Sequence, residues 1–108
     1  MRYGIISDIH GNTEALRACV DELDRQGIDR LVCLGDIVGY GAEPNECCDI
    51  IRENADLTVI GNHDAVLVGK LDEDYCHSAA RRALRFSARN LSDENYNFLA
   101  SLKYKDYE

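Results

Sequence analysis

Short apolar runs alternate with longer amphipathic segments along the first 60 residues of this 108-residue chain. The apolar runs cover residues 2–6, 31–34 and 57–60. The run at 31–34 is apolar at every position, which is typical of a parallel strand that is covered on both faces. These runs therefore predict three short β-strands.

Between and after these runs, apolar residues recur at the spacing of one helix face. Leu16, Cys19, Val20 and Leu23 share such a face, and Gly27 follows it as a helix stop. The whole pattern predicts helices over about residues 13–26, 45–54, 74–90 and 92–102, with a loop at 39–44 and a short charged tail at 103–108.

The order β-α-β-α-β with short connections is the signature of an α/β fold with a parallel sheet. Two further helices complete the predicted chain. Right-handed crossovers would place both early helices on one face of the sheet unless the strand order reverses, and the sequence leaves that order open. Length predicts one small domain, and no linker or repeat divides the chain.

Metal-capable side chains follow each of the three predicted strands. Asp8 and His10 come after the first strand, Asp36 after the second, and Asn62 and His63 after the third. The carboxyl ends of parallel strands meet at one edge of a sheet, where sites in α/β proteins form. Each residue alone could equally cap a turn or shape a loop. Their joint occurrence at three strand ends favours a shared site.

The spacing of these residues suggests which role each could have in binding a metal ion. Asp8 and His10 are two positions apart, so an extended backbone would aim both side chains the same way, toward one cation. Asp36 has two carboxylate oxygens and could bridge two cations. Asn62 offers a neutral oxygen, and Asp64 could hold the ring of the neighbouring His63 by a hydrogen bond.

The segments that carry these residues resemble the first three motifs of the calcineurin-like metallophosphoesterases, in both order and spacing. They are Asp8-Ile9-His10-Gly11-Asn12, Gly35-Asp36-Ile37-Val38-Gly39-Tyr40-Gly41 and Gly61-Asn62-His63-Asp64. The similarity is greatest to the single-domain phosphodiesterase-like branch of bacteria and archaea. Protein phosphatases of the Ser/Thr type carry Asp-Arg-Gly in place of residues 39–41 and Glu in place of Asp64, so the resemblance to them is weaker.

The resemblance implies hydrolysis of phosphomono- or phosphodiesters by a metal-bound hydroxide in a site with two divalent ions. Asp8 and His10 would hold the first ion, Asp36 would bridge, and Asn62 would bind the second ion and the phosphate. His63 and Asp64 would form a catalytic pair, in which His63 protonates the leaving oxygen or stabilises its developing charge and Asp64 orients it. Oxygen and nitrogen ligands suit Mn, Fe, Zn or Ni, with Mn favoured.

Motifs of the second half of that family are missing from these 108 residues. A later His and a Gly-His-x-His would complete both metal shells, but the histidines are His10, His63 and His77, and His77 is expected at the surface or as a helix cap. Residues 1–108 thus correspond to the N-terminal half of a four-layer αββα sandwich. The chain is either part of a longer enzyme or a truncated, non-catalytic half-domain that acts as a binding or association module. A receiver-like signalling domain is a further structural rival.

This incomplete sandwich has consequences for activity and association. We expect the chain alone to bind Mn²⁺ weakly and to be inactive or nearly so. One sheet face would lack its cover, which could favour a homo-oligomer.

Charge and composition limit the classes of partner that this chain is expected to bind. The formal charge of −8 disfavours binding to a nucleic-acid backbone. No apolar stretch reaches the length of a membrane span, and the start of the chain lacks the pattern of a signal peptide, so a cytoplasmic location is expected. The substrate would be a small phosphate ester, and a nucleotide is one candidate because Tyr40 could stack on a base or else pack into its own loop. The five cysteines are expected to be reduced and mostly buried.

Overall fold

The computed structural model describes residues 1–104 and contains a three-stranded parallel sheet in the order β1-β2-β3. The strands are β1 (Tyr3–Ile6), β2 (Arg30–Cys33) and β3 (Leu57–Thr58). Ile5 pairs with Val32, and Val32 pairs with Leu57, so one row of apolar residues crosses the sheet. The predicted α/β class and parallel sheet are confirmed.

Five α-helices and one 3-10 turn connect and follow these strands within the described residues. They are α1 (Thr13–Arg25), α2 (Pro44–Asn54), α3 (Asn62–Leu67), η1 (Glu73–Tyr75), α4 (Ser78–Asn90) and α5 (Asp93–Ser101). No helix among residues 1–104 is both long enough and apolar enough to cross a membrane.

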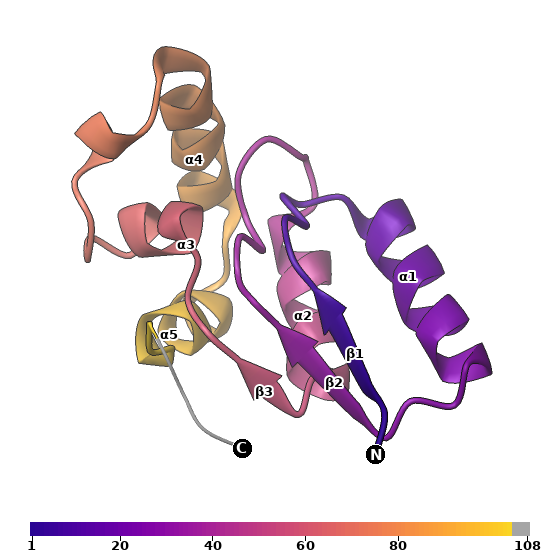
Figure 1. Cartoon of the computed structure of the whole chain (residues 1–108). Coiled ribbons are helices and arrows are strands. Elements are labelled where there is room, and N and C mark those ends of the chain that lie inside the picture. The colour runs from indigo at the N-terminus through magenta and orange to yellow at the C-terminus, as the bar shows by residue number, and fades with distance from the viewer. Residues whose placement is uncertain (105–108) are drawn as a thin grey trace.

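The helices lie behind and beside the sheet (Figure 1). Helix α2 lies behind the strands, and α3, α4 and α5 gather beside β3. On the helix side of the sheet, Leu31 and Cys33 are buried, and Cys33 belongs to the core cluster that contains Ile51 of α2. Helix α1 lies on this side as well, because a Cβ added to Gly4 would meet the Leu23 side chain of α1. The unreversed strand order therefore leaves both early helices on one face.

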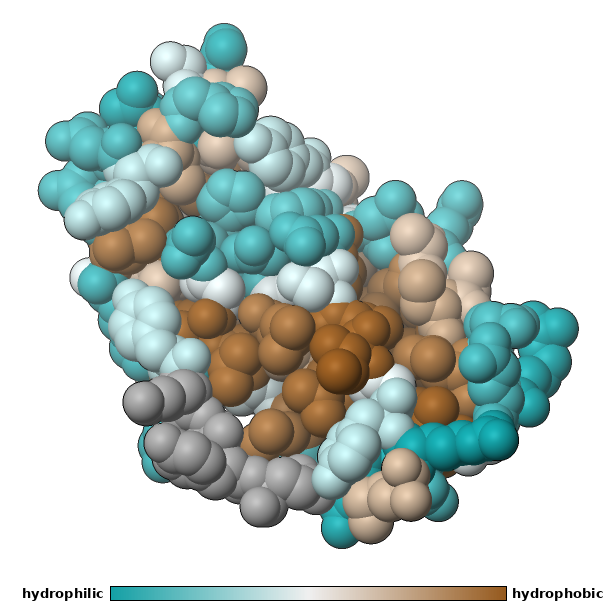
Figure 2. Space-filling model, viewed as in Figure 1, coloured by the Kyte–Doolittle hydropathy of each residue, from teal (hydrophilic) through white to brown (hydrophobic). Residues whose placement is uncertain are grey.

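The opposite face of the sheet carries exposed apolar side chains. Ile5 is 62% exposed and Leu34 is 48% exposed. Figure 2 shows a hydrophobic patch on the face of the molecule that lies in front of the strands in Figure 1. Within the described part of the chain, no helix covers this face, which agrees with the uncovered sheet expected from the sequence.

Several element boundaries differ from the prediction, and one helix is additional. The helix expected from residue 74 begins at Ser78, because η1 precedes it and His77 caps it. The third strand ends at Thr58, and Val59 forms an isolated bridge with Lys103 instead. Helix α3 was not predicted. Of the predicted tail, residues 105–108 lie outside the described part of the chain.

All five cysteines are free thiols. Cys33, Cys47, Cys48 and Cys76 are buried, as expected, whereas Cys19 is exposed on α1. Their packing within the apolar core explains their presence without a disulfide or a zinc knuckle.

Candidate metal centre

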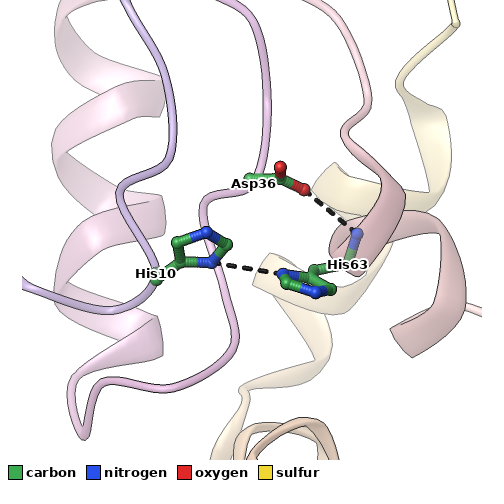
Figure 3. Close-up of side chains that lie close together, drawn as sticks. All are labelled: His10, Asp36 and His63. Carbon is green, nitrogen blue, oxygen red and sulfur yellow. Dashed lines mark hydrogen bonds between the residues drawn. The ribbon is translucent and has the colours of Figure 1, made fainter. Parts of the chain in front are cut away.

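Three loops at the carboxyl edge of the sheet bring His10, Asp36 and His63 together (Figure 3). One potential ligand atom from each residue lies within 4.8 Å of the others. His10 follows β1, Asp36 follows β2, and His63 lies in the first turn of α3. Their potential ligand atoms face one another. All three residues are only partly buried, so these atoms remain accessible.

The environment of His10 selects one tautomer of its ring. Nδ1 lies 3.1 Å from the carbonyl oxygen of Val38, and a carbonyl can only accept, so Nδ1 carries the hydrogen. In the neutral ring Nε2 then has a free lone pair, as a metal ligand requires. This nitrogen lies 3.5 Å from Oδ1 of Asp8. Asp8 and His10 therefore present a carboxylate oxygen and an imidazole nitrogen side by side.

Asp36 and His63 are joined through the backbone. The His63 N–H donates a hydrogen bond of 3.0 Å to Oδ1 of Asp36, which leaves the other carboxylate oxygen for another partner. The Nδ1 atoms of His63 and His10 lie 3.3 Å apart. The one hydrogen on His10 Nδ1 already serves the Val38 carbonyl at 3.1 Å, so it can reach His63 only as the longer branch of a bifurcated bond. Burial lowers the pKa of His63, which favours a neutral ring at this position.

Backbone conformation sets this site apart from the rest of the described chain. Within residues 1–104, four non-glycine residues have a left-handed backbone: Asp8 (φ 56°), His10 (φ 50°), Asp36 (φ 54°) and Tyr40 (φ 57°). All four were candidate site residues on sequence grounds. The expected extended backbone at Asp8 and His10 is therefore wrong, since β1 ends at Ile6. The Asp8 and His10 side chains still lie next to each other, but the left-handed backbone at both residues, and not an extended strand, brings them together. Such residues concentrate at functional sites.

Two glycines allow the loops of the site to approach closely. A Cβ on Gly35 would lie 2.2 Å from the Gly61 nitrogen, and a Cβ on Gly61 would lie 2.2 Å from the Asp36 nitrogen. No side chain fits at such distances. The pair therefore fixes the separation between the loop after β2 and the start of α3, and with it the distance from Asp36 to His63.

Asp64 is fully buried and holds the same two segments together. Its carboxylate accepts hydrogen bonds from the backbone N–H groups of Gly61, Ile37 and Val38. Burial raises its pKa to about 6, although these three hydrogen bonds act in the opposite direction. Among the described residues, Asp64 has no hydrogen bond with the His63 ring. It supports that ring by fixing the backbone around it.

Asn62 and Tyr40 lie at the open side of the site. Asn62 is exposed at the start of α3, and its amide has no hydrogen-bond partner among residues 1–104. Tyr40 is 50% exposed, and its ring packs edge-on against His10 and His63, with centroid distances of 5.2 and 5.5 Å. The Asp8 side chain is 70% exposed.

His77 also reaches this region, which the sequence did not indicate. It was expected as a surface or capping residue, and its side chain does cap α4 by accepting a hydrogen bond from the Ala80 N–H. In addition, its Nε2 lies 3.0 Å from the Tyr40 hydroxyl. The separation of 37 positions gave no local signal for that contact.

The donor set suits a divalent transition metal. Carboxylate oxygens of Asp8 and Asp36 and the imidazole nitrogen of His10 are the mixed ligands that Mn, Fe, Zn and Ni accept, and the His63 ring lies in the same cluster. Asp36 lies beside the two contacting histidine rings, with one carboxylate oxygen bonded to the His63 N–H and the other available. The residues present therefore fit the group that the sequence motifs imply.

Comparisons with known proteins agree with this geometry. The profile of the calcineurin-like phosphoesterase family matches residues 1–107. An uncharacterized protein of Methanocaldococcus jannaschii is 46% identical over 98 residues, which are 91% of this chain and 40% of that protein. This chain therefore spans about two fifths of the length of that curated relative.

Two crystal structures are similar as well. A metallophosphoesterase from Sphaerobacter thermophilus is 39% identical with a TM-score of 0.81, over 100% of this chain and 44% of that one. A protein provisionally assigned as a diadenosine tetraphosphatase is 28% identical with a TM-score of 0.65, over 94% of this chain and 42% of its own. Fold, metal-capable cluster and sequence profile agree, and this chain belongs to the calcineurin-like phosphoesterase family.

Proposed function

We propose that this chain supplies part of a two-metal site that hydrolyses phosphomono- or phosphodiesters. The observation that carries the proposal is the cluster of His10, Asp36 and His63, whose ligand atoms lie within 4.8 Å of one another. Asp8 and His10 would hold a first ion, Asp36 would be shared with a second, and Asn62 would contact the second ion and a phosphate oxygen. Bound divalent cations, with Mn favoured, supply Lewis-acid activation of water and positive charge for the phosphate.

The protein residues have distinct parts in this proposal. His63 delivers a proton to the leaving oxygen, and its hydrogen bond to Asp36 holds it beside the bridging carboxylate. Asp64 acts with it as a positioning residue, through the backbone hydrogen bonds that fix the start of α3. Tyr40 contacts the organic group of the ester.

The substrate we favour is a small phosphate ester, with nucleotides among the candidates. The similar structure provisionally assigned as a diadenosine tetraphosphatase supports that choice. The net charge of −8 argues against a nucleic-acid backbone as partner. A cytoplasmic location stays a prediction.

Residues 1–108 form a partial domain in this view, and the chain alone hydrolyses esters barely or not at all. The second candidate function is an association module without catalysis. The exposed apolar sheet face supports it, and a homo-oligomer through that face is the form we propose for it.

Titration with Mn²⁺ tests the metal site directly. Paramagnetic broadening in a ¹H–¹³C spectrum of histidine-labelled protein should remove the signals of His10 and His63 at the lowest Mn²⁺ concentrations. Asp36→Asn should weaken the effect at least about tenfold, because it removes a charged ligand. Asp21→Asn makes the same chemical change on the exposed surface of α1 and should leave it unchanged.

Turnover tests the catalytic half of the proposal. With Mn²⁺ and bis(p-nitrophenyl) phosphate, the chain alone should release little or no nitrophenol. Robust turnover abolished by Asp36→Asn would contradict our view that these residues are insufficient. Equal Mn²⁺ broadening in Asp36→Asn and the unchanged protein would exclude the metal site itself.

A further inference from the structure

Tyr40 lies between the candidate metal ligands and the start of α4. Its ring is perpendicular to those of His10 and His63, at interplanar angles of 83° and 76°. On its other side, the hydroxyl contacts Nε2 of His77 at 3.0 Å. That contact is the one hydrogen bond of the Tyr40 side chain within the described residues. It joins a loop to a helix 37 positions away.

The conformation of Tyr40 needs outside support. Its left-handed backbone (φ 57°) is unfavourable for a bulky side chain. The ring is half exposed, so core packing holds only part of it. The hydroxyl is the group through which other parts of the fold can hold the exposed part of the Tyr40 ring in place.

The cap of α4 sets the direction of the hydrogen bond. His77 Nδ1 accepts from the Ala80 N–H, so in the neutral ring the hydrogen is on Nε2. Nε2 therefore donates to the Tyr40 oxygen. The phenolic hydrogen is left free for an acceptor on a bound ester.

We propose that His77 is a positioning residue of the site: it holds the Tyr40 ring against His10 and His63 by its hydrogen bond to the Tyr40 hydroxyl. This inference rests on the proposed function, in which Tyr40 contacts the ester. His77 has no contact with His10 or His63 in the described structure. Besides the path through Tyr40, His77 acts on His63 only through a weak charge effect on its pKa, so the double variant with Tyr40→Phe is needed to isolate the path through Tyr40.

The NMR signals of the histidine rings test this proposal without metal or substrate. The chain has three histidines, so a ¹H–¹³C spectrum of histidine-labelled protein contains one set of ring signals for each. His77→Asn keeps a strong N-cap for α4 but is too short to reach Tyr40. We expect this variant to shift the signals of both His10 and His63, because the aromatic ring beside them moves.

Tyr40→Phe should shift the same two histidines, and the double variant should add little to either single one. Tyr75→Phe is the matched control, because it removes a hydroxyl from an exposed tyrosine just before α4. Circular dichroism and thermal unfolding confirm that each variant is folded.

Unmoved His10 and His63 signals in folded His77→Asn would overturn the proposal, as would additive shifts in the double variant. A ¹⁵N spectrum that places the His77 hydrogen on Nδ1 would contradict the hydrogen-bond direction. Failure of Mn²⁺ to bind would instead contradict the metal site, so the two proposals fail separately.

Discussion

At the scale of single residues, the geometry of the site depends on two glycine positions at which the backbones approach too closely for any side chain to fit. Gly35 and Gly61 lie so close that an added Cβ on either would overlap the backbone of the other loop. Gly27 offers a comparison, since it is also left-handed (φ 71°) but has open space around it. The effects of conformation and of close approach can therefore be separated.

We predict that Gly61→Ala and Gly35→Ala each lower the free energy of unfolding by more than about 2 kcal/mol, because backbone atoms must move. Gly27→Ala should lower it by about 1–2 kcal/mol, from backbone conformation alone. Urea denaturation measures all three. Equal losses in Gly27→Ala and Gly61→Ala would contradict the close approach.

Buried thiols make stability depend on pH above neutrality. Burial raises the pKa of Cys33 to about 12 from a reference of 9.0, and it also raises the pKa values of Cys47 and Cys48. The folded state thus keeps protons that the unfolded state releases, so stability is full below about pH 9 and falls between about pH 9 and 12.

The measurement is the free energy of unfolding at several pH values in a reducing buffer. Each fully buried thiol should contribute up to about 1.4 kcal/mol per pH unit in this window. Cys33→Ala should be less stable overall because of its cavity, but its loss with rising pH should be shallower. An unchanged slope would show that Cys33 ionises as easily in the folded protein.

At the scale of elements, a polar network joins α2 to α5. Asn95 is 2% exposed, and its amide donates to Asn45 and Asp49 and accepts from Arg52. The network aligns α5 beside β3, where Lys103 then pairs with Val59. A buried amide with this many partners is costly to leave unsatisfied or to remove.

Asn95→Ala should lower the free energy of unfolding by about 2–3 kcal/mol, because it removes a buried amide and all of its hydrogen bonds to α2. Asn97→Ala on the exposed side of the same helix should change it by less than about 0.5 kcal/mol. Thermal denaturation of both variants checks the contrast. Similar melting temperatures would place the attachment of α5 elsewhere.

Much of the element pattern was predictable because it rests on local rules. The three strands, the first two helices and α5 follow from apolar spacing and caps. Helix α3 was missed because its start coincides with the Asn62-His63-Asp64 motif, and its six residues give less than two turns of periodicity. The site residues followed from parallel-strand topology.

Other features of the site depend on contacts between distant segments. The left-handed backbone at Asp8 and His10 follows from hydrogen bonds of residues 10 and 11 to the loop after β2. The Asp64 carboxylate binds three N–H groups that only the folded chain brings together. The contact of His77 with Tyr40 likewise exists only once α4 is in place. Such contacts have no local sequence signal.

At the scale of the whole molecule, one sheet face is apolar and uncovered by described residues (Figure 2). Ile5, Val32 and Leu57 form a row across it, and Leu34 extends it. Patches of this kind on isolated chains mark association surfaces. The relatives that match are more than twice as long as this chain.

Light scattering should therefore give a mass above 12.1 kDa that rises with concentration. Ile5→Lys places a charge on the most exposed part of the apolar row and should return the mass to that of a monomer. Tyr75→Lys, an equally exposed position away from the sheet, should not change the association. A monomer at every concentration in the unchanged protein would contradict the prediction.

At the four left-handed residues, the side chains that the site needs come at a cost in backbone stability. Glycine would relieve the backbone at Asp8, His10, Asp36 and Tyr40, since it adopts positive φ without a steric penalty. Directed evolution that rewards heat resistance alone would therefore drift toward glycine at these positions. Such a lineage would become more robust as it lost the imidazole and the carboxylates, so any thermostabilised descendant of this protein should be selected on metal binding in every round.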